Sequence, residues 1–170
     1  KSINNPSVCL LNIGFGSDSF AFNKYDSGLC VIDIASTSTD CNLASNETPS
    51  PFDTSYSQRD WCLYKVAVKS GDLNSCLNLA AKNYCLSEIA RKTLDLKVCE
   101  MFSDKFDRDF CIGEIVRLTL NATLCNIVSE DMKEYCIWQQ VVGIQERGNK
   151  TLCGNVANES NRQKCFEWFG

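Results

Sequence analysis

Apolar residues recur along most of this chain with the spacing of amphipathic helices. A large apolar residue follows five of the cysteines directly, and three of those cysteines have an apolar pair four and five positions further on. The pairs are Val66 and Ala67, Ile89 and Ala90, and Ile115 and Val116. Positions i, i+1, i+4 and i+5 lie on one face of a helix with 3.6 residues per turn. The pattern therefore predicts a series of helices, each with one buried face that carries a cysteine.

The start of each predicted helix has a repeated signature. The signature has four positions: a basic residue, a polar residue, a third residue that is usually aromatic, and Cys. This order occurs five times, beginning at Arg59, Lys82, Arg108, Lys133 and Arg162. The cysteines of the signature lie 23 to 29 residues apart, from Cys62 to Cys165. A fixed period of this length is typical of repeat proteins.

A second cysteine follows in four of the repeats. Thirteen residues separate it from the first cysteine in the first three repeats and sixteen do so in the fourth. These second cysteines are Cys76, Cys99, Cys125 and Cys153. Four positions before each stands Asp or Asn, at Asp72, Asp95, Asn121 and Asn149. Such side chains accept hydrogen bonds from the free amides of a first helical turn, so each predicts the N-cap of a short second helix. An apolar residue three positions after each second cysteine is expected on the same face as the sulfur: Leu79, Phe102, Val128 and Val156.

These elements predict an all-α fold, a short α-solenoid of disulfide-stapled helical hairpins. Residues 59–170 carry the regular repeats, and residues 30–58 carry a degenerate one that is interrupted by a loop with Pro49 and Pro51. Residues 1–29 are rich in Gly, Ser, Asn and Phe, which favours an irregular capping or contact segment. The predicted array is therefore residues 30–170, preceded by a segment of a different kind.

Twelve cysteines in 170 residues, and no histidine, bear on compartment and chemistry. Structural metal sites use ligands two to four residues apart, whereas the closest cysteines here, Cys76 and Cys85, have eight residues between them. An even count at this density favours a disulfide framework in an oxidising compartment. We expect no metal and no cofactor.

Helix geometry selects a pattern of disulfides. Two residues of antiparallel helices face each other when they lie equally far from the connecting turn. The midpoints of Cys99 and Cys111 and of Cys125 and Cys136 fall in polar turns, whereas a bridge from Cys62 to Cys76 would leave an axial mismatch of roughly 6 Å. The predicted pairs are therefore consecutive: Cys9–Cys30, Cys41–Cys62, Cys76–Cys85, Cys99–Cys111, Cys125–Cys136 and Cys153–Cys165.

Four Asn-x-Ser/Thr sequons fall in predicted surface turns, at Asn46, Asn121, Asn149 and Asn158. We expect N-glycans on at least two of them, although the same residues also suit N-caps and turns. The sequence contains no basic-then-apolar leader and no apolar run of 18 residues. The chain is therefore expected to be secreted, at the cell surface or outside the cell, without membrane insertion of the mature chain.

Charge and missing motifs narrow the possible activities. A net charge of −4 argues against nucleic acid as a partner, and the lack of His excludes catalysis that depends on imidazole. Asp104, Asp107 and Asp109, with Arg108 among them, are the best candidates for paired catalytic carboxylates, as in a glycosidase. The alternative is a turn with acidic residues in a first helical turn, where they favour the positive end of the helix. We favour that alternative and expect no enzyme.

Aromatic residues fall into two groups. Those before the helix cysteines, Trp61, Tyr84, Phe110 and Tyr135, form either a ligand ladder or, as we favour, packing between hairpins. Two clusters break the repeat: Phe15, Phe20, Phe22 and Tyr25 near the start, and Phe166, Trp168 and Phe169 near the end. They are candidate contacts between subunits or, alternatively, intramolecular caps.

The signature, the helical stripe and the Asp-x-x-x-Cys spacing together resemble cysteine-rich α-helical repeats of secreted, archaeal-type proteins, and the hairpins are similar to shortened tetratricopeptide or Sel1-like units. The resemblance covers residues 59–170 clearly and residues 30–58 poorly. It implies an architecture and no activity. The leading hypothesis is a secreted, glycosylated structural protein that self-associates head to tail into an extracellular filament or cell-surface assembly. The alternative is a monomeric extracellular repeat module that binds a protein or a glycan.

Overall fold

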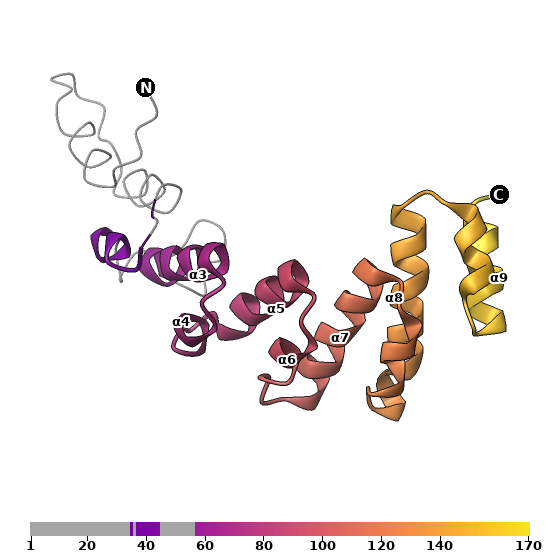
Figure 1. Ribbon diagram of the computed structural model, residues 1–170, viewed down its shortest axis with the longest axis horizontal. Coiled ribbons are helices and arrows are strands. Elements are labelled where there is room, and N and C mark those ends of the chain that lie inside the picture. Colours follow the sequence, from indigo (N-terminus) through magenta and orange to yellow (C-terminus); the bar gives the residue numbers. More distant parts are fainter. Residues whose placement is uncertain (1–34, 36, 45–56) are drawn as a thin grey trace, which may run out of the picture. The chain divides into compact units, whose positions relative to one another are not determined.

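The computed structural model describes residues 35, 37–44 and 57–170. Within these ranges the chain forms helices and no β-strand, so the all-α prediction is confirmed there (Figure 1). Several predictions concern residues outside them, namely the segment 1–29, the pair Cys9–Cys30, the sequon at Asn46 and the first aromatic cluster. The chain divides into two compact units, residues 1–85 and 86–170.

The first unit contains η1 (Asp40–Leu43), α3 (Gln58–Ser70), α4 (Leu73–Leu77) and the start of α5 (Lys82–Thr93). Its buried core joins Ala35, Cys41, Ala44, Cys62 and Val66, with Trp61 and Leu63 packed against them. The cysteine and the valine four residues later lie on one face of α3. This is the face that the apolar spacing predicts.

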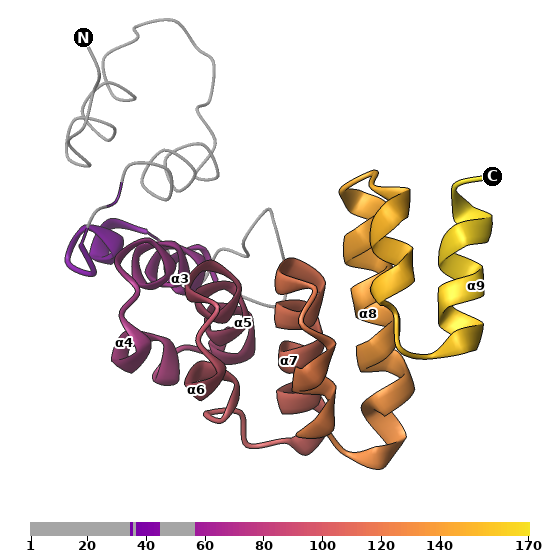
Figure 2. The ribbon, with the colours of Figure 1, turned by 45° about the vertical axis from the view of Figure 1, so that its right-hand side comes forward.

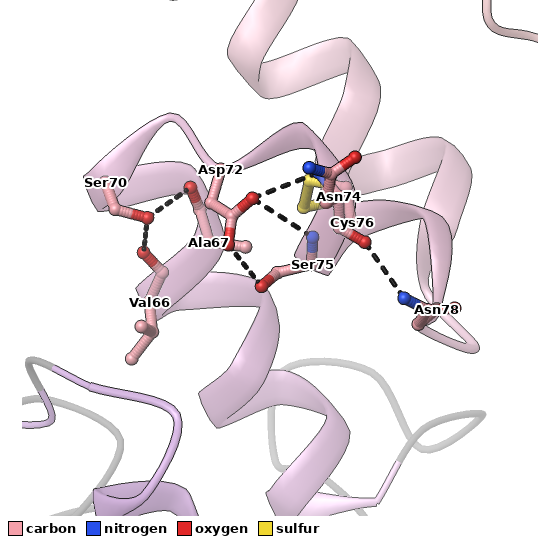
Figure 3. Close-up of a disulfide and its surroundings, with 9 residues drawn as sticks. Val66, Ala67, Ser70, Asp72, Asn74, Ser75, Cys76 and Asn78 are labelled. Atoms are coloured by element: carbon pink, nitrogen blue, oxygen red, sulfur yellow. Dashed lines mark hydrogen bonds between the residues drawn. A yellow bond between two sulfur atoms is a disulfide. The ribbon is translucent and has the colours of Figure 1, made fainter.

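Local hydrogen bonds set the limits of α3 and α4. Ser57 and Asp60 form a reciprocal capping box at the start of α3. The helix ends at Gly71, whose φ of 73° lies in the left-handed region that glycine adopts without steric cost. Figure 3 shows the Asp72 carboxylate accepting from the backbone N–H groups of Asn74 and Ser75, beside the Cys76 sulfur. The turn between the two helices is therefore encoded in its own residues.

The second unit contains the remainder of α5 and three longer helices that alternate with short ones. In chain order these are α6 (Leu96–Cys99), α7 (Lys105–Thr119), η2 (Ala122–Asn126), η3 (Glu130–Met132), α8 (Lys133–Glu146), η4 (Lys150–Asn155) and α9 (Glu159–Trp168). α7 packs against α8, and α8 against α9, and the three lie side by side in both ribbon views (Figures 1 and 2). The long and short helices of the predicted repeat are thus present.

The short helices begin where the sequence predicts. Asp72, Asp95, Asn121 and Asn149 each cap the following turn through a side-chain oxygen. Two of these short elements are 3₁₀ helices, η2 and η4, in place of α-helices. All four end before the apolar residue that was expected on their face. Phe102, Val128 and Val156 are nonetheless buried just beyond the helix end, whereas Leu79 is only half-buried.

Five disulfides join consecutive cysteines, and no described cysteine is unpaired. The pairs are Cys41–Cys62, Cys76–Cys85, Cys99–Cys111, Cys125–Cys136 and Cys153–Cys165. Their Cα–Cα distances of 5.4 to 5.6 Å lie near the preferred value for a disulfide. Each bond links a short helix to the long helix that follows it. These are the five consecutive pairs that were predicted for this part of the chain from the equal distances of the two cysteines from the turn.

α7 and α8 approach each other closely at Gly143. A Cβ atom at this position would lie 2.1 Å from the backbone oxygen of Arg117. The end of α7 is held at the same place by polar contacts. Gln140 donates to the Leu120 carbonyl at 3.1 Å, and the Arg147 guanidinium donates to the Arg117 carbonyl at 3.2 Å. These bonds satisfy carbonyls that a helix end leaves without partners.

Candidate functional site

The candidate catalytic carboxylates have structural partners. Asp104 caps α7, accepting from the Phe106 backbone N–H at 2.8 Å. Asp109 is fully buried and accepts from both the backbone N–H and the hydroxyl of Ser129, while Arg108 pairs with its second oxygen. Burial raises the pKa of Asp109, but the Ser129 and Arg108 contacts outweigh burial and hold this pKa below its ordinary value. Asp109 therefore ties α7 to the turn before η3.

The described residues contain no group of three or more His, Cys, Asp or Glu side chains placed to hold a metal ion. Nor is any helix among them both long enough and apolar enough to cross a membrane.

Three sequon asparagines lie exposed in the described part of the chain, and all three are N-caps. Asn121 and Asn149 accept through Oδ1 from the backbone N–H and the hydroxyl of the sequon threonine, Thr123 or Thr151. Asn158 accepts through Oδ1 from the Asn161 backbone N–H at 3.0 Å. A glycan attaches at Nδ2, the atom that these caps do not use. Capping and glycosylation are therefore compatible at each site.

The aromatic residues before the helix cysteines are used in different ways. Phe110 of α7 stacks on Tyr135 of α8 with ring centroids 5.4 Å apart, which agrees with packing between hairpins. Trp61 instead contacts Tyr64 of its own helix at 4.6 Å. Tyr84 is 53% exposed. The predicted packing thus holds for one pair of helices and is not a uniform property of the repeat.

The second aromatic cluster, Phe166, Trp168 and Phe169, contains one residue that packs against the core and two that are exposed to solvent. Phe169 packs against a buried core that includes Val141 and Ile144, so it acts as an intramolecular contact. Trp168 is 68% exposed and Phe166 is 38% exposed. Two of the three candidate subunit contacts in this cluster are thus available on the surface of α9.

The outward face of α9 differs from that of α7. α7 meets Tyr135 of α8 through Phe110 and Gly113, which lie one position before and two positions after its cysteine. The same positions of α9 hold Lys164 and Glu167, both exposed, although the Lys164 ammonium reaches back over the Trp138 ring of α8. Glu167 also accepts a hydrogen bond from Gln163 at 2.9 Å. The surface of α9 that corresponds to the helix-packing surface of α7 is therefore charged.

A cavity of about 250 Å³ lies between α8 and α9. It is lined by Glu134, Tyr135 and Trp138 of α8 and by Asn161 and Lys164 of α9. Asn161 is only 3% exposed, and its Nδ2 atom has no hydrogen-bond partner. The Lys164 ammonium lies 5.8 Å from the centroid of the Trp138 ring. The cavity thus combines aromatic surface, an amide donor without a partner and charges of both signs.

The surroundings of Tyr135 keep its hydroxyl protonated. Burial and the nearby Glu114 carboxylate raise the pKa of Tyr135 to about 12, against an opposing effect of Arg117. The phenol therefore stays neutral at any physiological pH. It contributes an uncharged aromatic surface to the cavity.

The sequence pattern does not indicate this cavity, because it places Tyr135 in packing between hairpins and gives no role to Trp138 or Asn161. The spacing of Glu134, Tyr135 and Trp138 is a usable signal, because positions i, i+1 and i+4 share one helix face. Nothing in the sequence marks Asn161 as buried without a partner, since that depends on how α8 and α9 pack.

Two other cavities contain weaker signals. One of about 280 Å³ is lined by residues that include Thr123, Lys133 and Ile137, and one of about 200 Å³ by residues that include Leu63 and Leu79. No lining residue of either has a buried polar side-chain atom without a partner. The α8–α9 cavity is therefore the stronger candidate.

Comparison with protein-family models, curated proteins and solved structures finds no match to this chain.

Proposed function

We propose that this protein is an exported, glycosylated repeat module that works by binding and not by catalysis. The five disulfides are consistent with an oxidising environment, in which such bonds form and persist. The exposed sequons at Asn121, Asn149 and Asn158 support export, because glycans need surface positions with room around them. Stapled hairpins that recur every 23 to 29 residues support a short α-solenoid as the scaffold.

The observation that carries this proposal is the α8–α9 cavity. Binding sites are concave and mainly apolar, with a few polar groups that set orientation. The Trp138 and Tyr135 rings, together with the unpartnered Asn161 amide and two charged residues in the same lining, match that description. Two of the three candidate carboxylates for chemistry, by contrast, have structural roles, because Asp104 caps α7 and Asp109 anchors it to Ser129. The surface best suited to function is thus a recognition surface.

The charged face of α9 supports a monomeric module. Head-to-tail growth through this face would bring a second copy against the exposed Glu167 carboxylate, at the position where α7 presents Gly113 to α8. Burying unpaired charges is costly, and polar outer faces keep repeat arrays soluble. Self-association through this surface is accordingly disfavoured.

A second candidate is the subunit of an extracellular filament or cell-surface assembly. The exposure of Trp168 and Phe166 favours it, because a second copy of the chain would remove both rings from water. The contact would have to use the side of α9 that carries these rings and avoid the charged face. The two candidates therefore make opposite predictions about oligomeric state.

Light scattering across a range of concentrations, with electron microscopy of the same samples, separates them. The module proposal predicts a monomer of 19.0 kDa plus any glycan mass at every concentration. Filaments, or a mass that grows with concentration, would contradict it. If filaments form, the double variant Phe166→Ser, Trp168→Ser should disperse them under the second candidate, while Leu94→Ser, at another exposed apolar residue, should not.

A further inference from the structure

We propose that the α8–α9 cavity binds a single sugar residue of a glycan. This inference rests on the binding-module proposal and names the class of ligand. Nothing else in the described part of the chain brings together aromatic rings, a buried donor without a partner and a free acceptor in one cavity. Each of these matches one part of a pyranose ring.

The aromatic lining suits the apolar side of a sugar. A pyranose has a face of C–H groups that packs on the flat surface of an indole or phenol ring. Trp138 and Tyr135 lie one helical turn apart on α8 and both line the cavity, and a sugar that stacks on Trp138 displaces the Lys164 ammonium from above that ring. The Phe110 ring stacks on Tyr135 and holds its orientation. This platform is therefore built into the packing of α7 and α8.

The polar lining suits the hydroxyl groups. A hydroxyl both donates and accepts, so one ring can accept from the Lys164 ammonium while it donates to the Glu134 carboxylate, and it can accept from the buried Asn161 Nδ2 atom once that side chain turns toward it. A buried donor without a partner is unfavourable, and this is the state of Asn161 in the absence of a ligand. A ligand that accepts from Nδ2 removes the penalty. Ligand binding would therefore explain why the Asn161 amide is buried without a partner in the protein alone.

The charges argue against other classes of ligand. A phosphate or a carboxylate would be attracted by Lys164 and repelled by Glu134 in the same cavity, whereas a cation would meet the reverse. A neutral polyol satisfies both groups. The volume of about 250 Å³ is below the range of about 300–1,000 Å³ that is usual for drug-sized ligands, so it fits one ring and not an extended chain.

The sugar has two possible sources. One is a glycan on another molecule. The other is the glycan of this chain at Asn158, whose side chain caps the turn that contains Asn161 and lies 3.0 Å from its backbone nitrogen. Both sources present the same chemistry to the cavity. A comparison of sugar binding by glycosylated and by unglycosylated protein distinguishes them.

The test uses the whole chain with its disulfides formed, made once without glycans and once with them. Saturation-transfer NMR would probe glucose, methyl α-mannoside and N-acetylglucosamine at up to about 50 mM, because a single ring is expected to bind with a dissociation constant on the order of 1 mM. Asn161→Ala and Glu134→Gln should weaken binding by about tenfold, the effect of losing one hydrogen bond to the ligand. Gln163→Ala, on the exposed face of α9, and Trp168→Ala should leave the affinity unchanged.

Several outcomes are decisive. Binding by the unglycosylated chain that is weakened about tenfold in Asn161→Ala supports the site. If binding of free sugar appears only when the Asn158 glycan is absent, the chain's own glycan is the occupant, which also supports it. No transfer to any of the three sugars by a folded, oxidised chain, or equal affinity in Asn161→Ala, would overturn the inference. A monomer that binds no sugar refutes this site and leaves the module proposal intact, whereas filaments refute the module whatever the NMR shows.

Discussion

Gly143 provides the sharpest test of how α7 and α8 pack. A Cβ atom there would lie 2.1 Å from the Arg117 backbone oxygen, 2.9 Å from its carbonyl carbon and 2.9 Å from a Leu120 methyl group. Ordinary van der Waals contact begins at 3.4 Å. The Leu120 side chain can move, but the Arg117 carbonyl belongs to the helix backbone and accepts from Arg147. Gly143→Ala therefore forces the two helices apart.

The expected cost follows from two opposing contributions. Overpacking of a core costs about 1–3 kcal/mol, and a clash with backbone lies at or above the upper end of this range. Replacing Gly by Ala inside a helix recovers about 1 kcal/mol of helix propensity. Gly143→Ala should then lower the free energy of unfolding by about 2–3 kcal/mol.

Urea unfolding of the oxidised protein, followed by far-UV circular dichroism, measures this change. Gly154→Ala is the matched control, because a Cβ at Gly154 meets nothing within 4 Å, and its free energy of unfolding should change by less than about 0.5 kcal/mol. Gly113→Ala should fall between the two, since its nearest contact, at 2.9 Å, is the Tyr135 ring. If Gly143→Ala unfolds at the same urea concentration as Gly154→Ala, the close approach of α7 and α8 is wrong.

Three further predictions concern Asp109, a cap and a disulfide. Ser129→Ala removes a hydroxyl donor from the buried Asp109 carboxylate, so stability at neutral pH should fall by about 1.5–3 kcal/mol. Because the pKa of Asp109 is lowered on folding, its stabilisation is present above its ordinary value of 3.8 and lost as pH falls through the lowered pKa. Ser129→Ala should raise that pKa and shift the loss to higher pH, and unchanged acid unfolding curves would refute this. In unglycosylated protein, Asn121→Ala should cost about 1 kcal/mol, whereas Asn121→Asp keeps the capping oxygen and should cost little; equal losses in urea unfolding would exclude a capping role. Replacing Cys99 and Cys111 together by Ala opens a loop with a sequence separation of 12 and should cost about 3 kcal/mol by the chain-entropy estimate, so an unchanged urea midpoint would contradict the stapling role.

The parts of the fold that the sequence predicts are those determined by neighbouring residues. An Asp or Asn four positions before a cysteine caps the next turn through atoms of residues two or three positions away, as Asp72 does. Consecutive cysteines at equal distances from a turn pair for a reason that is also local. Asn121 and Asn149 could thus be placed as caps from the sequence alone.

The parts that it does not predict depend on contacts distant in sequence. Asp109 looks like a residue of an acidic first turn, but it is buried because Ser129, twenty residues later, donates to it. Asn161 looks like a helix-surface residue, yet the packing of α9 on α8 buries it without a partner. The sequence likewise does not distinguish the 3₁₀ helices η2 and η4 from α-helices, because Asn and Asp caps suit both kinds of helix.

Each short helix is stapled to the long helix after it, and peptide mapping of the native protein without reduction tests this pairing. The structure predicts linked peptides for Cys41–Cys62, Cys76–Cys85, Cys99–Cys111, Cys125–Cys136 and Cys153–Cys165. A linked peptide that joins Cys62 to Cys76, or any cysteine of a long helix to the short helix that follows it, would contradict it.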